Sequence, residues 1–195
     1  MWGILWGIGT LLCAAIFAAA YWRCCREFQM SLPVDSETAR NWLAAHPLRR
    51  RVALRQSDRI SSPLTFGVLR PVILLPKHTD WNDTPSLFYV FEHEFVHIQR
   101  FDTLAKLFLA AAVCLHWWNP LVWGMYVLAN RDIELSCDET VLRRLGGDRR
   151  ASYAKVLIRL AEHRSRFTPL CSHFSQTAME ERITAIMKIK KTTMV

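Results

Sequence analysis

Apolar residues gather in a few blocks along this chain, and basic polar segments separate the blocks. The first block, residues 1–22, carries no charged side chain and would span about 30 Å as a helix, the thickness of a bilayer's hydrocarbon core. The pattern predicts a transmembrane helix over residues 1–22. A cleaved signal peptide is the alternative, because Ala18 to Ala20 resemble a cleavage site, but a basic segment before the apolar run is missing and the run is long.

The next part of the chain alternates between helical and extended patterns. Residues 31–50 are typical of a helix capped by Asp35 or Ser36, with Pro47 beyond its end. Residues 52–76 favour strands, and the prolines and the glycine within residues 63–76 indicate an edge strand or a hairpin.

A longer helix is predicted from residue 84 onward, with Thr84 as its cap and Pro85 in its first turn. Apolar residues recur at helical spacing along it, so one side belongs to the core: Leu87, Val90, Phe91, Phe95 and Ile98. Further helices are expected over residues 131–146, 150–164 and 177–191, the first ending near Gly146 and Gly147.

Charge and cysteine usage narrow the setting. The net charge is +8, and Arg23, Arg26 and a basic segment over residues 46–59 follow the apolar block. By the positive-inside rule, the chain beyond residue 22 faces the cytoplasm. No DNA-binding motif accompanies the basic charge, so direct nucleic-acid binding is not expected. The six cysteines lack C-x-x-C spacing, so a disulfide framework is not expected either.

The segment HEFVH carries the candidate chemistry. His93 and His97 lie one helical turn apart on one face, and two neutral imidazoles at this spacing can bind Zn²⁺. Glu94 stands beside the first histidine, where it can take a proton from a water molecule that the ion polarises. The alternative is a helix that carries two histidines by chance.

A third ligand is expected from a later helix. In RDIELSCDE, Glu134 is the candidate ligand, and Asp138 lies one turn further on the same face. We expect Asp138 to accept a hydrogen bond from one of the ligating histidines. Taken alone, the two acidic residues would be read as a solvated helix face; the upstream motif favours the ligand interpretation.

Together, HEFVHIQRFD, WNPLVW and RDIELSCDE, in this order, resemble the BlaR/MecR-type membrane metallopeptidases, and PLTFGVLRPVILLP is similar to the same family. The resemblance covers roughly residues 30–190. It implies a gluzincin-type zinc site of His93, His97 and Glu134, with Glu94 catalytic, in the cytoplasmic membrane of a bacterium. Members relay a signal by proteolysis, commonly with loss of a transcriptional repressor. The resemblance also suggests that a strand, Leu64–Val68 or Val72–Leu75, binds extended substrate.

A common site for His93, His97 and Glu134 restricts the path of the chain between them. Two apolar arms, residues 104–118 and 121–130, would be about 22 Å and 15 Å long as helices, too short to span a bilayer perpendicularly. We therefore predict an apolar helical hairpin over residues 104–130, re-entrant or packed at the membrane surface, with Trp117, Trp118 and Trp123 at the interface. Ordinary domain core is the alternative.

The predicted fold class is α+β: a mainly helical gluzincin-type metallopeptidase domain over residues 30–190 with a small β-sheet, after an N-terminal transmembrane helix. The first functional hypothesis is a membrane-anchored zinc endopeptidase that contacts membrane lipid and cleaves a protein, either a repressor or itself. The second is a non-enzymatic signalling module with a structural metal site, which would need a fourth protein ligand. The oligomeric state stays open, with a homo-oligomer among the alternatives.

Overall fold

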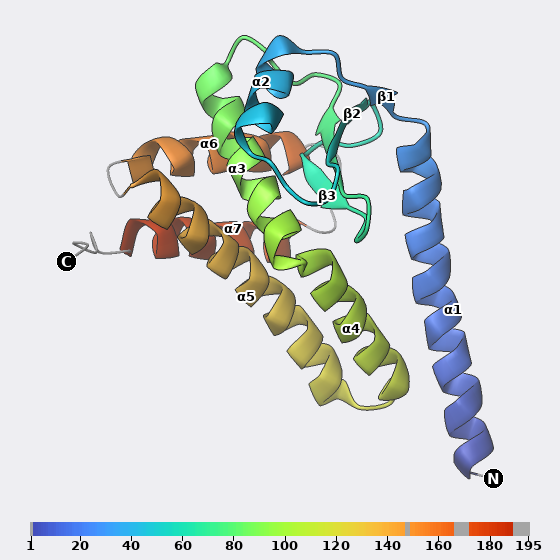
Figure 1. The fold of residues 1–195 in the computed structure, drawn as a ribbon. Coiled ribbons are helices and arrows are strands. Elements are labelled where there is room, and N and C mark those ends of the chain that lie inside the picture. The colour runs from blue at the N-terminus through green and yellow to red at the C-terminus, as the bar shows by residue number, and fades with distance from the viewer. Residues whose placement is uncertain (1, 147–148, 166–171, 189–195) are drawn as a thin grey trace.

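The structure, a computed structural model, describes residues 2–146, 149–165 and 172–188. Within these residues, a long helix precedes a small sheet, one short helix lies between the first two strands of that sheet in the chain, and five further helices follow (Figure 1). This mainly helical α+β organisation with an apolar N-terminal helix confirms the predicted fold class. The helices are α1 (Trp2–Gln29), α2 (Glu37–Ala45), α3 (Thr84–Arg100), α4 (Asp102–Leu115), α5 (Pro120–Leu145), α6 (Arg150–Ser165) and α7 (Ser172–Lys188).

The sheet has the strand order β1-β2-β4-β3. β2 and β4 run parallel, whereas β3 pairs with β4 as an antiparallel hairpin and forms an edge of the sheet. The predicted hairpin with an edge strand is therefore confirmed. β4 is interior, and its central residues Ile73, Leu74 and Leu75 are fully buried. The strands are β1 (Leu32–Pro33), β2 (Ala53–Ser57), β3 (Leu64–Phe66) and β4 (Val72–Pro76).

Helix α3 begins with a cap one residue earlier than the sequence predicted. Asp83 is the cap, and its carboxylate accepts a hydrogen bond from the Ser86 backbone N–H at 3.2 Å. Thr84 is the first helical residue, so its prediction as the cap was wrong; an aspartate caps as well as a threonine and stood next to it. Pro85 lies in the first turn, as expected.

Helices α3 and α4 are separated by a single residue. Phe101 adopts a left-handed conformation with φ of 59°, which is uncommon for a bulky side chain. The Arg50 guanidinium lies 3.8 Å from the centre of the Phe101 ring and donates hydrogen bonds to the carbonyls of Ile98 and Val68. These contacts hold the sharp turn, which directs the next residue, Asp102, back toward α3.

Helices α4 and α5 form the predicted hairpin, but α5 is longer than its predicted arm. It runs unbroken for 26 residues from Pro120, so one helix contains both the apolar arm and Glu134. The hairpin lies beside α1: the Trp6 indole donates to the Leu115 carbonyl at 3.0 Å, and the Trp117 indole donates to the Trp6 carbonyl at 3.4 Å. The tip of the hairpin therefore lies near the N-terminal end of α1. With α1 across a membrane, the tip would lie at the same depth in that membrane as this end of α1.

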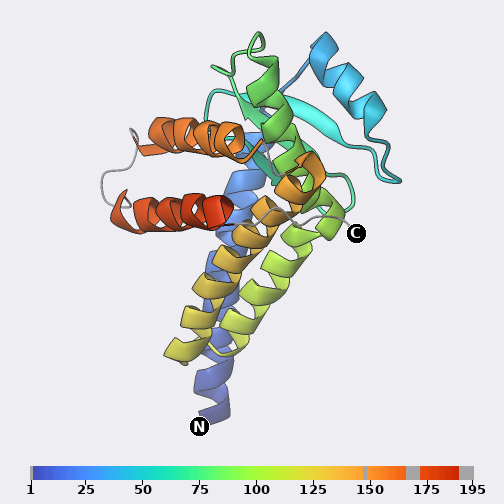
Figure 2. The ribbon, with the colours of Figure 1, turned by 90° about the vertical axis from the view of Figure 1, so that its left-hand side faces the viewer.

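α1 and the hairpin of α4 and α5 expose large apolar side chains. α1 is long and apolar enough over Trp2–Arg26 to cross a membrane. Along the hairpin, Phe108 is 67% exposed and Leu121 is 79% exposed. Large apolar side chains this exposed do not form a domain core, so the alternative of ordinary core does not hold for the hairpin. α1, α4 and the first half of α5 extend from the sheet in one direction (Figure 2).

Helices α6 and α7 lie side by side (Figure 2); α7 packs against α5, and α6 packs against α3. Tyr153 of α6 and Ile186 of α7 are fully buried. They join a core that includes Phe91 and Phe95 of α3. Of the predicted C-terminal helices, residues 189–191 lie outside the described residues, as does Gly147. The core therefore surrounds α3, the helix that carries the two histidines.

Candidate metal centre

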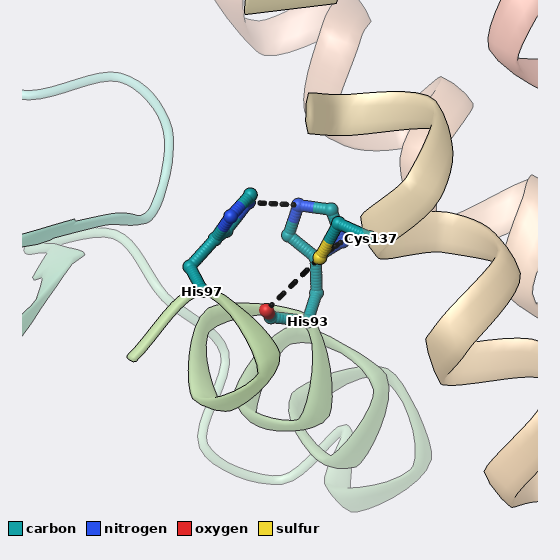
Figure 3. A group of neighbouring side chains, drawn as sticks. All are labelled: His93, His97 and Cys137. Atoms are coloured by element: carbon teal, nitrogen blue, oxygen red, sulfur yellow. Dashed lines mark hydrogen bonds between the residues drawn. The ribbon is translucent and has the colours of Figure 1, made fainter. Parts of the chain in front are cut away.

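His93 and His97 lie on one buried face of α3 with their rings nearly perpendicular (Figure 3). Their Nε2 atoms are 3.2 Å apart. The spacing of four residues creates this proximity, because one helical turn brings the side chains over each other. Both imidazoles are about nine-tenths buried. The two nitrogens therefore meet at a largely buried position.

The other ring nitrogen of each histidine is occupied by a hydrogen-bond partner. His93 Nδ1 lies 2.8 Å from the Tyr153 hydroxyl, and His97 Nδ1 lies 2.7 Å from Asp102 Oδ2. The Tyr153 hydroxyl donates its own proton to Asp138 and can therefore accept from the imidazole. With both Nδ1 atoms as donors, each neutral ring presents the lone pair of Nε2. The partners set the rings in the tautomer that a metal requires.

Glu134 of α5 completes a group of three donors. Its Oε2 lies 3.6 Å from His93 Nε2, and its Oε1 lies 3.7 Å from His97 Nε2. The structure thus brings together the three residues that the sequence analysis selected as ligands, although 37 positions separate His97 from Glu134 in the chain. α5 makes this possible because it packs along α3 after the hairpin returns.

The three donors fit a zinc ion. In a tetrahedral site with bonds of about 2.0–2.1 Å, ligand atoms are separated by roughly 3.3 Å. The Nε2 pair at 3.2 Å already has this spacing, and the two nitrogen–oxygen distances of 3.6 and 3.7 Å exceed it slightly. Two imidazoles and one carboxylate are also donors that zinc accepts in catalytic sites, where a fourth position stays open.

Cys137 is a further donor near the two histidines, and the sequence analysis did not consider it. His93, His97 and Cys137 form a buried cluster whose potential ligand atoms lie within 4.8 Å of one another. The thiol, however, lies 3.5 Å from His93 Nδ1 and 3.4 Å from the His93 carbonyl (Figure 3). Cys137 thus contacts the Nδ1 side of the His93 ring and also interacts with His97, whereas Glu134 lies at His93 Nε2.

Asp138 lies behind His93. Its Oδ1 is 3.3 Å from His93 Nδ1 and accepts a shorter hydrogen bond of 2.7 Å from the Tyr153 hydroxyl. The direct contact that we expected between a histidine and Asp138 is therefore present, and the Tyr153 hydroxyl provides a second link with shorter hydrogen bonds. Arg182 of α7 binds both oxygens of Asp138, at 2.7 and 2.8 Å. Although burial opposes its charge, hydrogen bonds from Arg182 and His93 lower the pKa of Asp138 to about 2.

Charge is concentrated around Glu134. Lys106 Nζ lies 3.1 Å from Oε1, and Arg182 Nη1 lies 3.6 Å from Oε2. Burial alone would raise the pKa of Glu134, but hydrogen bonds and charges of His93 and His97 lower it far below its usual range. Burial likewise opposes a charge on His97, yet its hydrogen bonds, first that with Asp102, raise its pKa to about 11. Without metal, protons on the two imidazoles therefore supply the positive charge beside Glu134.

Glu94 lies on the sheet side of the same site. Its Oε2 accepts a hydrogen bond of 2.7 Å from the Thr65 hydroxyl on the edge strand β3. A cavity of about 2110 Å³ joins Glu94, both histidines and Glu134 to the whole of β3. Of the two candidate strands, β3 forms an edge of the sheet beside this cavity, whereas β4 pairs with a strand on both sides. The cavity can thus admit a chain alongside β3 toward the histidines.

Other predicted features contribute less. His46 pairs with Glu92 at 2.8 Å on a different face of α3, and His116 binds the Ala112 carbonyl near the hairpin tip. Among residues with described side chains, the other histidines do not line the cavity; the side chains of His163 and His173 lie outside that part of the chain. The residues that the sequence analysis missed are Asp102, Cys137, Tyr153 and Arg182. Only Asp102 carried a sequence signal, its place just after the motif.

Comparison with known proteins finds a matching family model and similar proteins. The model of the BlaR1 peptidase M56 family matches residues 1–186. The chain is similar to regulatory protein BlaR1 of Bacillus licheniformis, with 35% identity over 130 residues, which cover 66% of this chain and 22% of that protein. It is also similar to regulatory protein BlaR1 of Staphylococcus aureus, with 25% identity over 114 residues, 58% of this chain and 20% of that protein. The chain thus spans about a fifth of the length of these relatives.

Proposed function

The chain belongs to the BlaR1 peptidase M56 family, and from this premise we propose that it is a membrane-anchored zinc endopeptidase that cleaves a protein in signal transduction. One observation carries the proposal: two Nε2 atoms with fixed tautomers and a buried carboxylate converge at the spacing of zinc ligands. His93, His97 and Glu134 would hold the ion. When bound, zinc supplies Lewis-acid chemistry that polarises water and the substrate carbonyl.

The residues around the ion would divide the remaining work. Glu94 takes the proton of the attacking water and passes it to the leaving amine, as a general base and then a general acid. The Thr65 hydroxyl orients Glu94 through its 2.7 Å hydrogen bond. The edge strand β3 binds the substrate backbone in extended form, as edge strands commonly do. Asp102 and Tyr153 keep the two imidazoles in the required tautomer.

The proposed location is the cytoplasmic membrane of a bacterium, with the site facing the cytoplasm. Two features support this orientation. Arg23 and Arg26 stand at the end of α1 that leads into the sheet. The exposed apolar surfaces of α1 and of the hairpin are suited to lipid contact. The two relatives described above are regulatory proteins, which supports a regulatory substrate: a cytoplasmic repressor, or a second copy of the peptidase itself.

A non-enzymatic module with a structural metal site is the second candidate, because Cys137 could provide the fourth ligand that a closed site needs. The position of its thiol weighs against this. The sulfur lies on the Nδ1 side of His93, and that nitrogen already has Tyr153 as a partner at 2.8 Å. A closed site would require the His93 ring or the thiol to change its orientation.

The proposal is tested with Glu94→Gln in detergent-purified protein. We expect the variant to keep one zinc per chain and to lose cleavage of itself and of a casein-like substrate, because only the proton carrier is removed. Glu139→Gln is the matched control, since Glu139 is half-exposed and pairs with Arg143 away from the site. Equal cleavage by Glu94→Gln and the control would exclude Glu94 from the reaction.

A further inference from the structure

Arg182 connects the last described helix to both carboxylates of the site. Its Nε donates to Asp138 Oδ2 at 2.7 Å, and its Nη2 donates to Oδ1 at 2.8 Å. The remaining nitrogen, Nη1, lies 3.6 Å from Glu134 Oε2. A single guanidinium from α7 therefore faces two acidic residues that lie one turn apart on α5.

We propose that Arg182 is a positioning residue of the metal centre, which holds Glu134 and, through Asp138 and Tyr153, the His93 ring in the geometry that binds zinc. The inference rests on the proposed function, since it concerns the same site. It adds α7 to the elements that build that site. The last of the sequence motifs, RDIELSCDE, ends at Glu139, so the motifs give this helix no role.

The connection to His93 consists of short hydrogen bonds. The forked contact with Arg182 fixes both oxygens of Asp138. Asp138 Oδ1 then accepts the Tyr153 proton at 2.7 Å, and this leaves the Tyr153 oxygen to accept from His93 Nδ1 at 2.8 Å. If Asp138 turned, Tyr153 could direct its proton at His93 Nδ1 instead. His93 would then carry its own proton on Nε2, the atom that must bind the metal.

A cation is also needed between the two carboxylates themselves. Glu134 and Asp138 are like charges one helical turn apart, and such a pair is unfavourable when buried. Lys106 also approaches Glu134, but its side chain is 41% exposed. The Arg182 side chain is only 15% exposed and contacts both residues. Arg182 is thus the buried counter-charge of the pair.

The neighbouring residue of α7 provides a control within the same helix. Glu181 forms an ion pair with Arg131 of α5, one turn before Glu134. This pair joins the same two helices but does not contact Glu134, Asp138 or the histidines in the described structure. Loss of the Glu181 pair therefore weakens the attachment of α7, whereas loss of Arg182 also removes the support of the site. The two effects can be separated experimentally.

The experiment compares Arg182→Met, Arg182→Lys and Glu181→Gln in full-length chain in detergent. Zinc affinity is measured by competition with a chromophoric chelator, and the visible absorption of the Co²⁺-loaded protein reports coordination geometry. We expect Arg182→Met to lose about 10- to 100-fold in zinc affinity, the usual effect of removing support behind ligands. It should also change the Co²⁺ spectrum and lower kcat more than it changes KM. Arg182→Lys should recover part of the affinity, and Glu181→Gln should match the parent protein.

If Arg182→Met does not fold, Asp138→Asn provides the test instead. Its isosteric side chain interrupts the same connection between Arg182 and His93. Where Arg182→Met folds, its double variant with Asp138→Asn should be no worse than the more affected single variant. Unchanged or tighter zinc binding by Arg182→Met, or an equal loss in Glu181→Gln, would overturn the inference. Absence of zinc from the parent protein would instead contradict the proposed function, so the two failures are distinguishable.

Discussion

The two halves of α5 belong to one unbroken helix but lie in opposite environments. In the first half, Leu121 is 79% exposed and Leu128 is 53% exposed. In the second half, Cys137, Val141 and Leu142 are almost fully buried, and Asp138 is buried among hydrogen-bond partners. The exposed half is the apolar one, and the buried half carries the charged site.

This difference in exposure indicates which environment surrounds each half of α5. Exposed leucines are unfavourable in water but not in lipid, so the first half is suited to a bilayer beside α1. The buried carboxylates of the second half are stable because tyrosine, arginine and imidazole partners surround them. One unbroken helix therefore connects the exposed apolar hairpin to the candidate metal centre.

The largest effect is expected from a substitution in the buried, charged half of α5. Glu134→Gln should reduce zinc content from about one per chain to nearly zero and abolish cleavage, because an amide is a much weaker ligand than a carboxylate. Asp132→Asn, an exposed position on the same helix, is the control. Metal analysis after gel filtration measures both variants, and zinc retention by Glu134→Gln at the parent level would remove Glu134 from the ligand set.

A smaller effect is expected from a substitution in the exposed, apolar half of α5. Met125 is 45% exposed, and its neighbour Tyr126 packs against Phe17 in the middle of α1. Met125→Arg should lower the free energy of unfolding in lipid nanodiscs by about 2.5–3.5 kcal/mol, the cost of an arginine at bilayer depth. Leu69→Arg, at an 82% exposed position in the β3–β4 turn, should change it little. Equal unfolding midpoints for the two variants would contradict a lipid-facing hairpin.

The smallest effect is expected from a change of pH without any substitution. Because the pKa of His97 is raised to about 11 without metal, the ring binds a proton at neutral pH that zinc must displace. A higher pH lowers the proton occupancy, so zinc affinity should rise by about tenfold per pH unit for each displaced proton between pH 6 and 8. Chelator competition at several pH values measures this slope. A flat profile would mean that zinc does not compete with that proton.

The sequence allowed the ligand candidates to be predicted because they follow local rules. The spacing of His93 and His97 follows from one helical turn, and Glu134 was selected because it precedes Asp138 by one turn in a later helix. Proline and glycine punctuation likewise identified β3 and β4 as an edge hairpin.

The supporting residues could not be found in this way, because their positions depend on tertiary packing. Tyr153 and Arg182 come from helices whose approach to α5 leaves no short-range pattern in the sequence. The depth of the hairpin beside α1 depends on contacts such as that of Trp117 with Gly9, where a Cβ would overlap the indole ring. The length of α5 was also underestimated, because the change from apolar to charged residues looked like a boundary.

Zinc K-edge X-ray absorption of the purified protein tests the central claim most directly. The account predicts a first shell of nitrogen and oxygen only, at about 2.0–2.1 Å, with the outer scattering of two imidazoles. The spectrum should not change in Cys137→Ser. A sulfur scatterer at about 2.3 Å that disappears in this variant would show that Cys137 binds the ion. That result would contradict the arrangement of His93, His97 and Glu134 with an open fourth position.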